Sequence, residues 1–404
     1  MLSCLLIAGS TCWAQQDVIT SLPQSPNAAL EQAGVPRTPA ISNPSSISSV
    51  LDSDSPFKWE PFVLRPHLLY RFLYGDGIQA RPGVPSTTAI DTFSPGFLLE
   101  VGTHWTFDYT PTWDLYSNHQ FKDTLGHDLS LAANYAYEGW TSQIKQSYAY
   151  SSQPIVETGI QTSEQDYDTA VDISHSMSQH VLMECNAIQS LRYAVGFPDS
   201  YSWTNSDRVH YRFSEQFDTA IGASFGYVHQ SIGPDTQFVT PETQLSWKPT
   251  EKITLSANGG LERREFLSKP RAILDSPTFN TSLSYLPTTF TTINLSAAQS
   301  VAPAYQAGQA LRTNVLSADV QQRLLKRLYL SGSAVHSKSN YHSTSGSVAT
   351  VRSDGQNTYS ARLSTEFLRR GTISILYTRT TNTSTTQGFG FTSHQIGMET
   401  VFRY

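Results

Sequence analysis

Hydrophobic and polar residues alternate with a period of two along most of the chain after Phe62. In the last stretch, the even positions from His394 to Tyr404 form a largely apolar row, and Gln395, Gly397, Glu399 and Arg403 form a polar one. A period of two is typical of a β-strand whose two faces meet different surroundings. The pattern therefore predicts a final strand that ends on an aromatic residue.

Similar segments of about ten residues recur from Phe62 onward, separated by breaks that are alternately short and long. The clearest apolar row runs from Phe217 to Tyr227. The segments number about eighteen, an even count that suits a closed barrel with both chain ends on the short-turn side. We predict short breaks such as Tyr109–Thr112, and long loops near Gly75 to Asp91, Arg263 to Pro277 and Ser337 to Gln356.

Aromatic residues lie near the predicted strand ends, which favours a membrane barrel over a soluble sandwich. Trp105, Phe107, Tyr109 and Trp113 surround one predicted turn, and Trp140 follows another. Aromatic girdles at the two membrane interfaces explain such positions. A β-propeller or β-helix is the soluble alternative, but no blade-length or solenoid repeat recurs. The sequence thus predicts an all-β protein: a transmembrane antiparallel up-and-down β-barrel.

Composition narrows the class of protein further. Only 15% of the 404 residues are charged, 11% are aromatic, and the formal net charge is −6. A nucleic-acid-binding protein would be expected to carry a basic patch, so nucleic acid is not an expected partner. No apolar run reaches the roughly 20 residues that a membrane-spanning helix needs, so strands must make any membrane span.

The first 57 residues differ from the rest of the chain. Residues 1–14 resemble the apolar core and cleavage end of a secretory signal peptide, with a short buried helix or a lipoprotein signal at Cys12 as alternatives. Residues 15–57 are rich in Ser, Pro, Ala, Asn and Gln, which favours a disordered, low-complexity periplasmic leader. A plug inside the lumen and a partner-binding arm are the competing interpretations. The barrel domain is expected to span residues 58–404.

Cysteine usage indicates neither a disulfide framework nor a metal site. Removal of the signal segment would leave Cys185 alone, and no CxxC pattern is present. We therefore expect no cofactor.

The signal-like start, the hairpin alternation and the terminal aromatic strand together resemble the bacterial outer-membrane β-barrel proteins grouped as putative β-barrel porins. This grouping includes barrels found beside exopolysaccharide-export genes in Gram-negative bacteria. The resemblance implies a location in the outer membrane with both termini periplasmic, and an assembly signal at Phe402 and Tyr404. It implies outer-membrane lipid, the barrel-assembly machinery, periplasmic chaperones, and small hydrophilic solutes or polysaccharide as partners. It implies no catalytic residue.

The inward row of the predicted strands supplies the candidate functional residues. The charged positions of this row are expected to line the lumen: Arg65, Arg71, Glu100, Asp128, Glu138, Asp168, Asp172, Arg208, Arg212, Arg323, Arg362 and Glu399. Opposed acidic and basic walls would put a transverse field across a water-filled channel and orient charged solutes. Alternatively, these charges pair between neighbouring strands or only solvate the interior.

Three functions remain open from the sequence. The first is a porin-like channel for passive diffusion of small hydrophilic solutes. The second is an outer-membrane component of exopolysaccharide export or assembly, in which tyrosines near the long loops stack on sugar rings. The third is a barrel-embedded hydrolase, for which Ser117 and His119 are the only suggestive pair, although no GxSxG motif is present.

Overall fold

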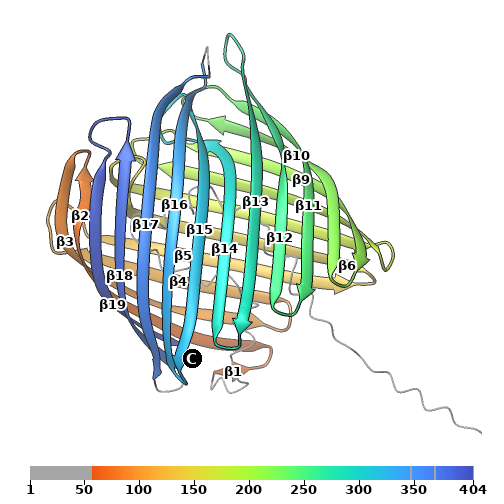
Figure 1. The fold of residues 1–404 in the computed structure, drawn as a ribbon, viewed down its shortest axis with the longest axis horizontal. Helices are drawn as coiled ribbons and strands as arrows, with labels where there is room; N and C mark the ends of the chain where they lie inside the picture. The colour runs from red at the N-terminus through yellow and green to blue at the C-terminus, as the bar shows by residue number, and fades with distance from the viewer. Residues whose placement is uncertain (1–56, 346–347, 368–369, 404) are drawn as a thin grey trace, which may run out of the picture.

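The computed structural model describes residues 57–345, 348–367 and 370–403. Nineteen strands join in one antiparallel sheet, and β2 to β19 close into an eighteen-stranded barrel (Figure 1). The predicted signal peptide, nearly all of the predicted leader and Tyr404 lie outside the described residues. No described helix is long and apolar enough to cross a membrane.

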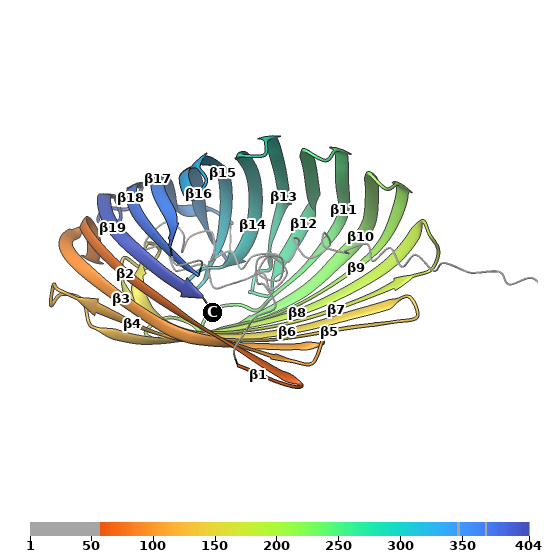
Figure 2. The same ribbon diagram turned by 90° about the horizontal axis from the view of Figure 1, so that it is seen from below.

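The strands follow one another around the barrel in chain order. Their bounds are β1 Lys58–Trp59, β2 Phe62–Arg81, β3 Val84–Val101, β4 Trp105–Tyr116, β5 Thr124–Tyr137, β6 Trp140–Ile155, β7 Ile160–Ser176, β8 Val181–Ala194, β9 Ser200–Ser214, β10 Phe217–Gln230, β11 Thr236–Thr250, β12 Ile253–Phe266, β13 Ala272–Thr288, β14 Thr291–Pro303, β15 Gln309–Leu325, β16 Leu328–Ser343, β17 Thr350–Phe367, β18 Gly371–Ser384 and β19 Phe391–Arg403. Seen from below, β4 to β7 form one side of a flattened barrel and β13 to β16 form the opposite side (Figure 2).

The final strand closes the barrel by pairing with β2. The antiparallel register runs from His394↔Asp76 to Arg403↔His67. β2 begins before this register does, and the short β1 pairs with its first residues as Lys58↔Val63 and Trp59↔Phe62. Closure leaves neither β2 nor β19 as an open edge in the hydrocarbon, where unpaired backbone groups are costly. Both ends of the described chain lie at one rim, which we call the turn end; the other rim is the loop end.

The predicted number of strands is confirmed, but one turn and several loops were placed wrongly. The chain turns at 102–104 and not at Tyr109–Thr112, because Gly102 adopts the left-handed conformation with φ of 60°. Pro111 lies inside β4. The β3–β4 pairing is interrupted between Phe93↔Trp113 and Phe97↔Tyr109, where Pro95 and Pro111 have no N–H to donate.

The predicted long loops are mostly strand. β2 and β3 continue to Arg81 and Val84 around a turn at Gly83, whose φ is 76°. Likewise, only 267–271 separate β12 from β13, and only 344–349 separate β16 from β17. Polar residues on both faces made these segments resemble loops, but near a barrel rim the outer face of a strand contacts water and needs no apolar row.

The outer face is apolar and carries a belt of aromatic rings. On β2, Leu68, Tyr70, Phe72 and Tyr74 point outward, and the intervening Arg71 and Leu73 are buried inside. Successive outward rings contact one another around the wall, for example Tyr148 with Tyr167 at 4.8 Å and Tyr193 with Tyr201 at 5.5 Å between ring centroids. This arrangement is expected of a wall that contacts lipid.

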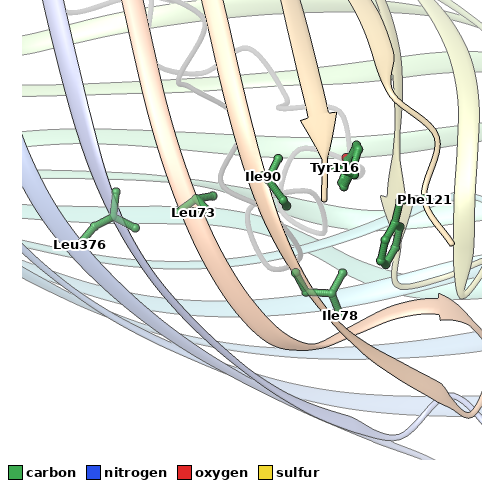
Figure 3. Close-up of a cluster of buried hydrophobic side chains, with 6 residues drawn as sticks. All are labelled: Leu73, Ile78, Ile90, Tyr116, Phe121 and Leu376. Atoms are coloured by element: carbon green, nitrogen blue, oxygen red, sulfur yellow. The ribbon is translucent and has the colours of Figure 1, made fainter. Parts of the chain in front are cut away.

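Some inward side chains near the loop end are apolar. Leu73, Ile78, Ile90, Tyr116, Phe121 and Leu376 pack together, and Figure 3 shows them on β2, β3, β4 and β18 and on the β4–β5 loop. Phe121 stacks on Tyr116 with ring centroids 5.3 Å apart. The β4–β5 loop is therefore anchored against the inner wall and does not project freely from the rim.

Candidate functional site: the lumen and its loop end

Three inner-face ion-pair groups contain predicted residues, and each joins strands close together in the barrel. Arg208 on β9 donates to Glu184 on β8 at 2.8 Å and to Glu242 on β11 at 2.9 Å. All three side chains are largely buried, and His210 lies 2.9 Å from the second oxygen of Glu184. Such a group is held by mutual charge compensation, since removal of one member leaves the others buried and unpaired.

The other two groups lie near the closing seam. Arg362 donates to Glu399 at 2.8 Å, and Arg65 donates to Glu100 at 3.2 Å. Arg71 lies directly opposite Glu399 in the β2–β19 register, within electrostatic range of Asp114. These basic residues therefore do not form a wall opposed to the acidic ones: the alternative of pairing between strands describes Arg65, Arg208 and Arg362.

The remaining predicted residues have different positions. Asp128 on β5 and Asp168 and Asp172 on β7 lie in the inner rows, where the amide of Asn186 donates to Asp172. Arg212 occupies the inner row at the turn end, where it is exposed. Arg323 also lies at that rim and donates to the carbonyl of Lys326 at 2.8 Å.

Glu138 was predicted to line the lumen, but it lies outside the strands. β5 ends at Tyr137, and Glu138 occupies the two-residue turn with φ of 44°, exposed to solvent. The period-two extrapolation ran one residue too far because the turn begins without a proline or glycine before Glu138.

A second group of side chains, not predicted from the sequence, lies across the loop end of the lumen. We call Glu157, Glu164, Arg192, Tyr305, Arg352 and Asp354 the mouth cluster. They come from the β6–β7 turn, β7, β8, the β14–β15 loop and β17, and therefore from both sides of the barrel. The cluster lets loops on opposite walls pack against each other within the barrel.

Glu157 is the centre of the mouth cluster. Its Oε1 accepts a hydrogen bond from the backbone N–H of Tyr305 at 2.6 Å, and its backbone carbonyl accepts one from Arg352 at 2.9 Å. Only 1% of Glu157 is exposed. Among the described residues, its Oε2 has no hydrogen-bond partner. The β6–β7 turn thus docks across the lumen although one oxygen of its buried carboxyl group has no hydrogen-bond partner.

Arg352 and Tyr305 bind the rest of the mouth cluster together. Arg352 makes two hydrogen bonds to Asp354, at 3.0 and 2.5 Å, and its guanidinium lies 3.6 Å from the centroid of the Phe389 ring. The hydroxyl of Tyr305 donates to Glu164 at 2.5 Å. Arg192 lies 4.2 Å from the centroid of the Tyr305 ring. Bidentate hydrogen bonds and cation–π contacts of this kind fix the orientation of a guanidinium group as well as the position of its charge.

Neighbouring loops join the same packing. The N–H of Gly83 in the β2–β3 turn donates to the carbonyl of Gly388 at 2.6 Å, and the N–H of Thr344 donates to Gly308 at 2.9 Å. The ring of Phe197 meets that of Tyr305 edge-on at 5.7 Å. Loops from around the loop end are therefore linked into one inward-packed layer.

Burial raises the pKa of the Glu157 carboxyl to about 7, although the hydrogen bond from Tyr305 and the charges of Arg192 and Arg352 act in the opposite direction. Burial likewise raises the pKa of the Tyr305 hydroxyl well above its usual range. A neutral carboxyl suits the docked position better than a carboxylate does, because a buried charge without full pairing is costly. We therefore expect the docking of the β6–β7 turn to be sensitive to pH.

Catalytic and metal sites find little support in the described residues. The hydroxyl of Ser117 accepts a hydrogen bond from the N–H of Ala89 at 2.8 Å, and no described contact joins it to His119. No group of three or more His, Cys, Asp or Glu side chains among the described residues could hold a metal ion. Tyr150, Tyr193 and Tyr201 belong to the outer aromatic belt, where they contact His127, Tyr167 and His229.

A closed barrel of eighteen antiparallel strands, with an apolar and aromatic outer face and a polar, charged inner face, is a transmembrane β-barrel of the outer-membrane type. Residues 246–404 match the family described as putative β-barrel porin 2. The match confirms, over these residues, the resemblance that the alternation and the terminal strand predicted.

Several solved structures are similar to this chain at low sequence identity. OccK2 (OpdF) of Pseudomonas aeruginosa, in complex with glucuronate, is 11% identical over 84% of this chain and 98% of its own, with a TM-score of 0.47. OpdK of the same organism, with vanillate, is 12% identical over 84% and 99%, with a TM-score of 0.47. A BenF-like porin from Pseudomonas fluorescens Pf-5 is 10% identical over 84% and 99%, with a TM-score of 0.48. No curated protein matches the chain.

Proposed function

We propose that this protein is a porin-like channel of the outer membrane through which small hydrophilic solutes diffuse passively. The observation that carries the proposal is the division of the barrel wall into an apolar outer face and a polar inner face around an eighteen-stranded circumference. A barrel of this size is wide enough to enclose a lumen that its own side chains do not fill. The match to a porin family over residues 246–404 supports the same function.

The mouth cluster is the proposed point of restriction. Solutes enter or leave past the loop end, where the β6–β7 turn docks on the β14–β15 loop and on β17 through Glu157. Displacement of this turn widens the path, and its return narrows the path. We expect no catalytic residue and no cofactor, and we expect both termini to be periplasmic.

Single-channel conductance of the refolded protein in planar bilayers tests the proposal. We expect discrete conductance steps that scale with salt concentration. A heat-modifiable barrel that inserts into the bilayer but never conducts, at any pH between 4 and 8, would overturn the channel function and favour a structural or assembly role.

A further inference from the structure

The two broad sides of the barrel differ in the chemistry of their inner faces. The inner rows of β4 to β7 hold seven carboxylates and one ammonium group: Asp108, Asp114, Asp128, Glu164, Asp166, Asp168 and Asp172, with Lys145. We call this side the acidic wall. Its formal charge is strongly negative.

The opposite side is almost uncharged. The inner rows of β13 to β16 are dominated by hydroxyl and amide side chains, and we call this side the hydroxyl wall: Ser276, Thr278, Asn280, Ser282, Ser284, Thr292, Asn294, Ser296, Ser300, Thr313, Ser317, Ser331, Ser333, Ser337 and Ser339. Its inward charges are Asp319 and, at the turn end, Arg323. Figure 2 shows the two walls facing each other across the barrel.

The hydroxyl wall is bonded within itself but keeps hydrogen-bonding capacity. Ser296 and Ser317 share a hydrogen bond of 2.7 Å, and Ser282 shares one of 2.7 Å with Ser256 on the adjoining strand β12. A hydroxyl offers one donor and two acceptor positions, so each member of such a pair can still bond to a solute. Ser282 and Asn294 are also exposed to the lumen.

The acidic wall keeps its negative charge where its partners are neutral. Asp108 accepts from the hydroxyl of Thr110 at 3.1 Å, and Asp172 accepts from the amide of Asn186. Three arginines lie near this wall: Arg192 lies directly opposite Asp166, Arg71 lies opposite Glu399, and Arg208 is shared by Glu184 and Glu242. The seven carboxylates outnumber Lys145 and these three arginines together. A concave wall with one sign of charge attracts the opposite sign and repels its own.

From these two walls we infer that the lumen prefers hydroxylated cationic and neutral solutes and disfavours hydroxylated anions. A small polyol with an ammonium group can place that group toward the acidic wall and its hydroxyls toward the hydroxyl wall. A polyol carboxylate of the same size has hydrogen-bonding partners on one wall only and is repelled by the other. The inference rests on the proposed channel function and names the solute class for that channel.

The test uses three polyols built on a six-carbon chain, similar in size and different in charge: N-methylglucamine, sorbitol and gluconate. Proteoliposome swelling at neutral pH measures the influx of each solute, and the reversal potential in a KCl gradient measures ion preference. We expect influx in the order N-methylglucamine, sorbitol, gluconate, with about a tenfold difference between the two charged solutes at low salt. Gluconate entering as fast as N-methylglucamine would overturn the inference.

Variants assign the preference to the walls. The double variant Asp168→Asn and Asp172→Asn should move the reversal potential toward that of an unselective pore, whereas Glu265→Gln, on the outer face, should not. Ser282→Lys, at an exposed position of the hydroxyl wall, is a second, independent test of the inference and should also reduce the preference for cations. An unchanged reversal potential in folded Asp168→Asn/Asp172→Asn and in folded Ser282→Lys would contradict the inference. Loss of all conductance in the unmodified protein would contradict the channel function instead.

Discussion

The backbone N–H of Tyr305 donates a hydrogen bond of 2.6 Å to the carboxyl of Glu157, although 148 residues separate the two in the chain. The bond joins the β6–β7 turn to the β14–β15 loop across the lumen. Because burial raises the pKa of Glu157 to about 7, we expect docking to depend on the protonation of this carboxyl.

The docked turn should loosen as pH rises. A carboxyl with a raised pKa in the docked state favours docking fully below its ordinary pKa of about 4.5 and loses that advantage between this value and about 7. The total loss amounts to about 3 kcal/mol. We therefore expect open probability in planar bilayers to increase from pH 4 to pH 8. Glu157→Gln should remove this dependence, and Glu251→Gln, at the exposed turn end, should retain it. An identical pH profile in Glu157→Gln would refute the role of Glu157.

The buried group around Arg208 should contribute to barrel stability. Arg208→Ala leaves Glu184 and Glu242 buried without their shared cation, and we expect a loss of about 3 to 5 kcal/mol in the free energy of unfolding. Arg212→Ala, four residues further along the same row but exposed at the rim, should change it by less than about 0.5 kcal/mol. Urea unfolding in detergent, followed by gel mobility, measures both. Equal effects would show that pairing at Arg208 contributes nothing.

Neighbouring positions on β14 should differ in their tolerance of charge. Leu295 points toward lipid and Asn294 points into the lumen opposite Asp319. Leu295→Arg should cost about 2 to 4 kcal/mol and impair assembly, and Asn294→Arg should assemble normally because water and Asp319 can accommodate the guanidinium. The yield of heat-modifiable protein in outer-membrane fractions compares the two. Equal yields would mean that the inward and outward rows are misassigned at this strand.

The orientation of the barrel can be determined by thiol labelling. Ser345 is exposed at the loop end and Thr250 is exposed at the turn end. In a Cys185→Ser background, a membrane-impermeant maleimide added to intact cells should label Ser345→Cys and spare Thr250→Cys. The opposite pattern would invert the predicted orientation and place the termini outside.

The last strand should be required for assembly. Phe402 lies opposite Leu68 at the β19–β2 closing seam, and Tyr404 follows beyond the described residues. Deletion of 402–404 should leave the protein degraded or aggregated in the periplasm, since it removes both the predicted assembly signal and part of the seam. Deletion of 15–44 should leave a heat-modifiable barrel in the outer membrane. Normal insertion of the first deletion would exclude this role for the terminal aromatics.

The sequence by itself determined the strands, their number and the face that each presents to lipid. Alternation at β10, from Phe217 to Tyr227, follows from the pleat of a single strand in contact with lipid on one side, so it needs no knowledge of distant residues. The order of the strands around the barrel follows as well, because each strand pairs with its neighbour in the chain. Short-range signals were misread where Pro111 resembled a turn residue inside β4, where Glu138 continued the strand pattern into a turn, and where polar strand ends resembled long loops.

Tertiary structure alone decided which inward charges meet and how the loop end is packed. Arg208 pairs with Glu184 and Glu242 because curvature and register bring three different strands to one point of the inner wall. Glu157 meets Tyr305 and Arg352 only because the barrel closes and brings loops from opposite walls together. Such contacts leave no periodic trace in the chain, since their geometry depends on the circumference and tilt of the whole barrel.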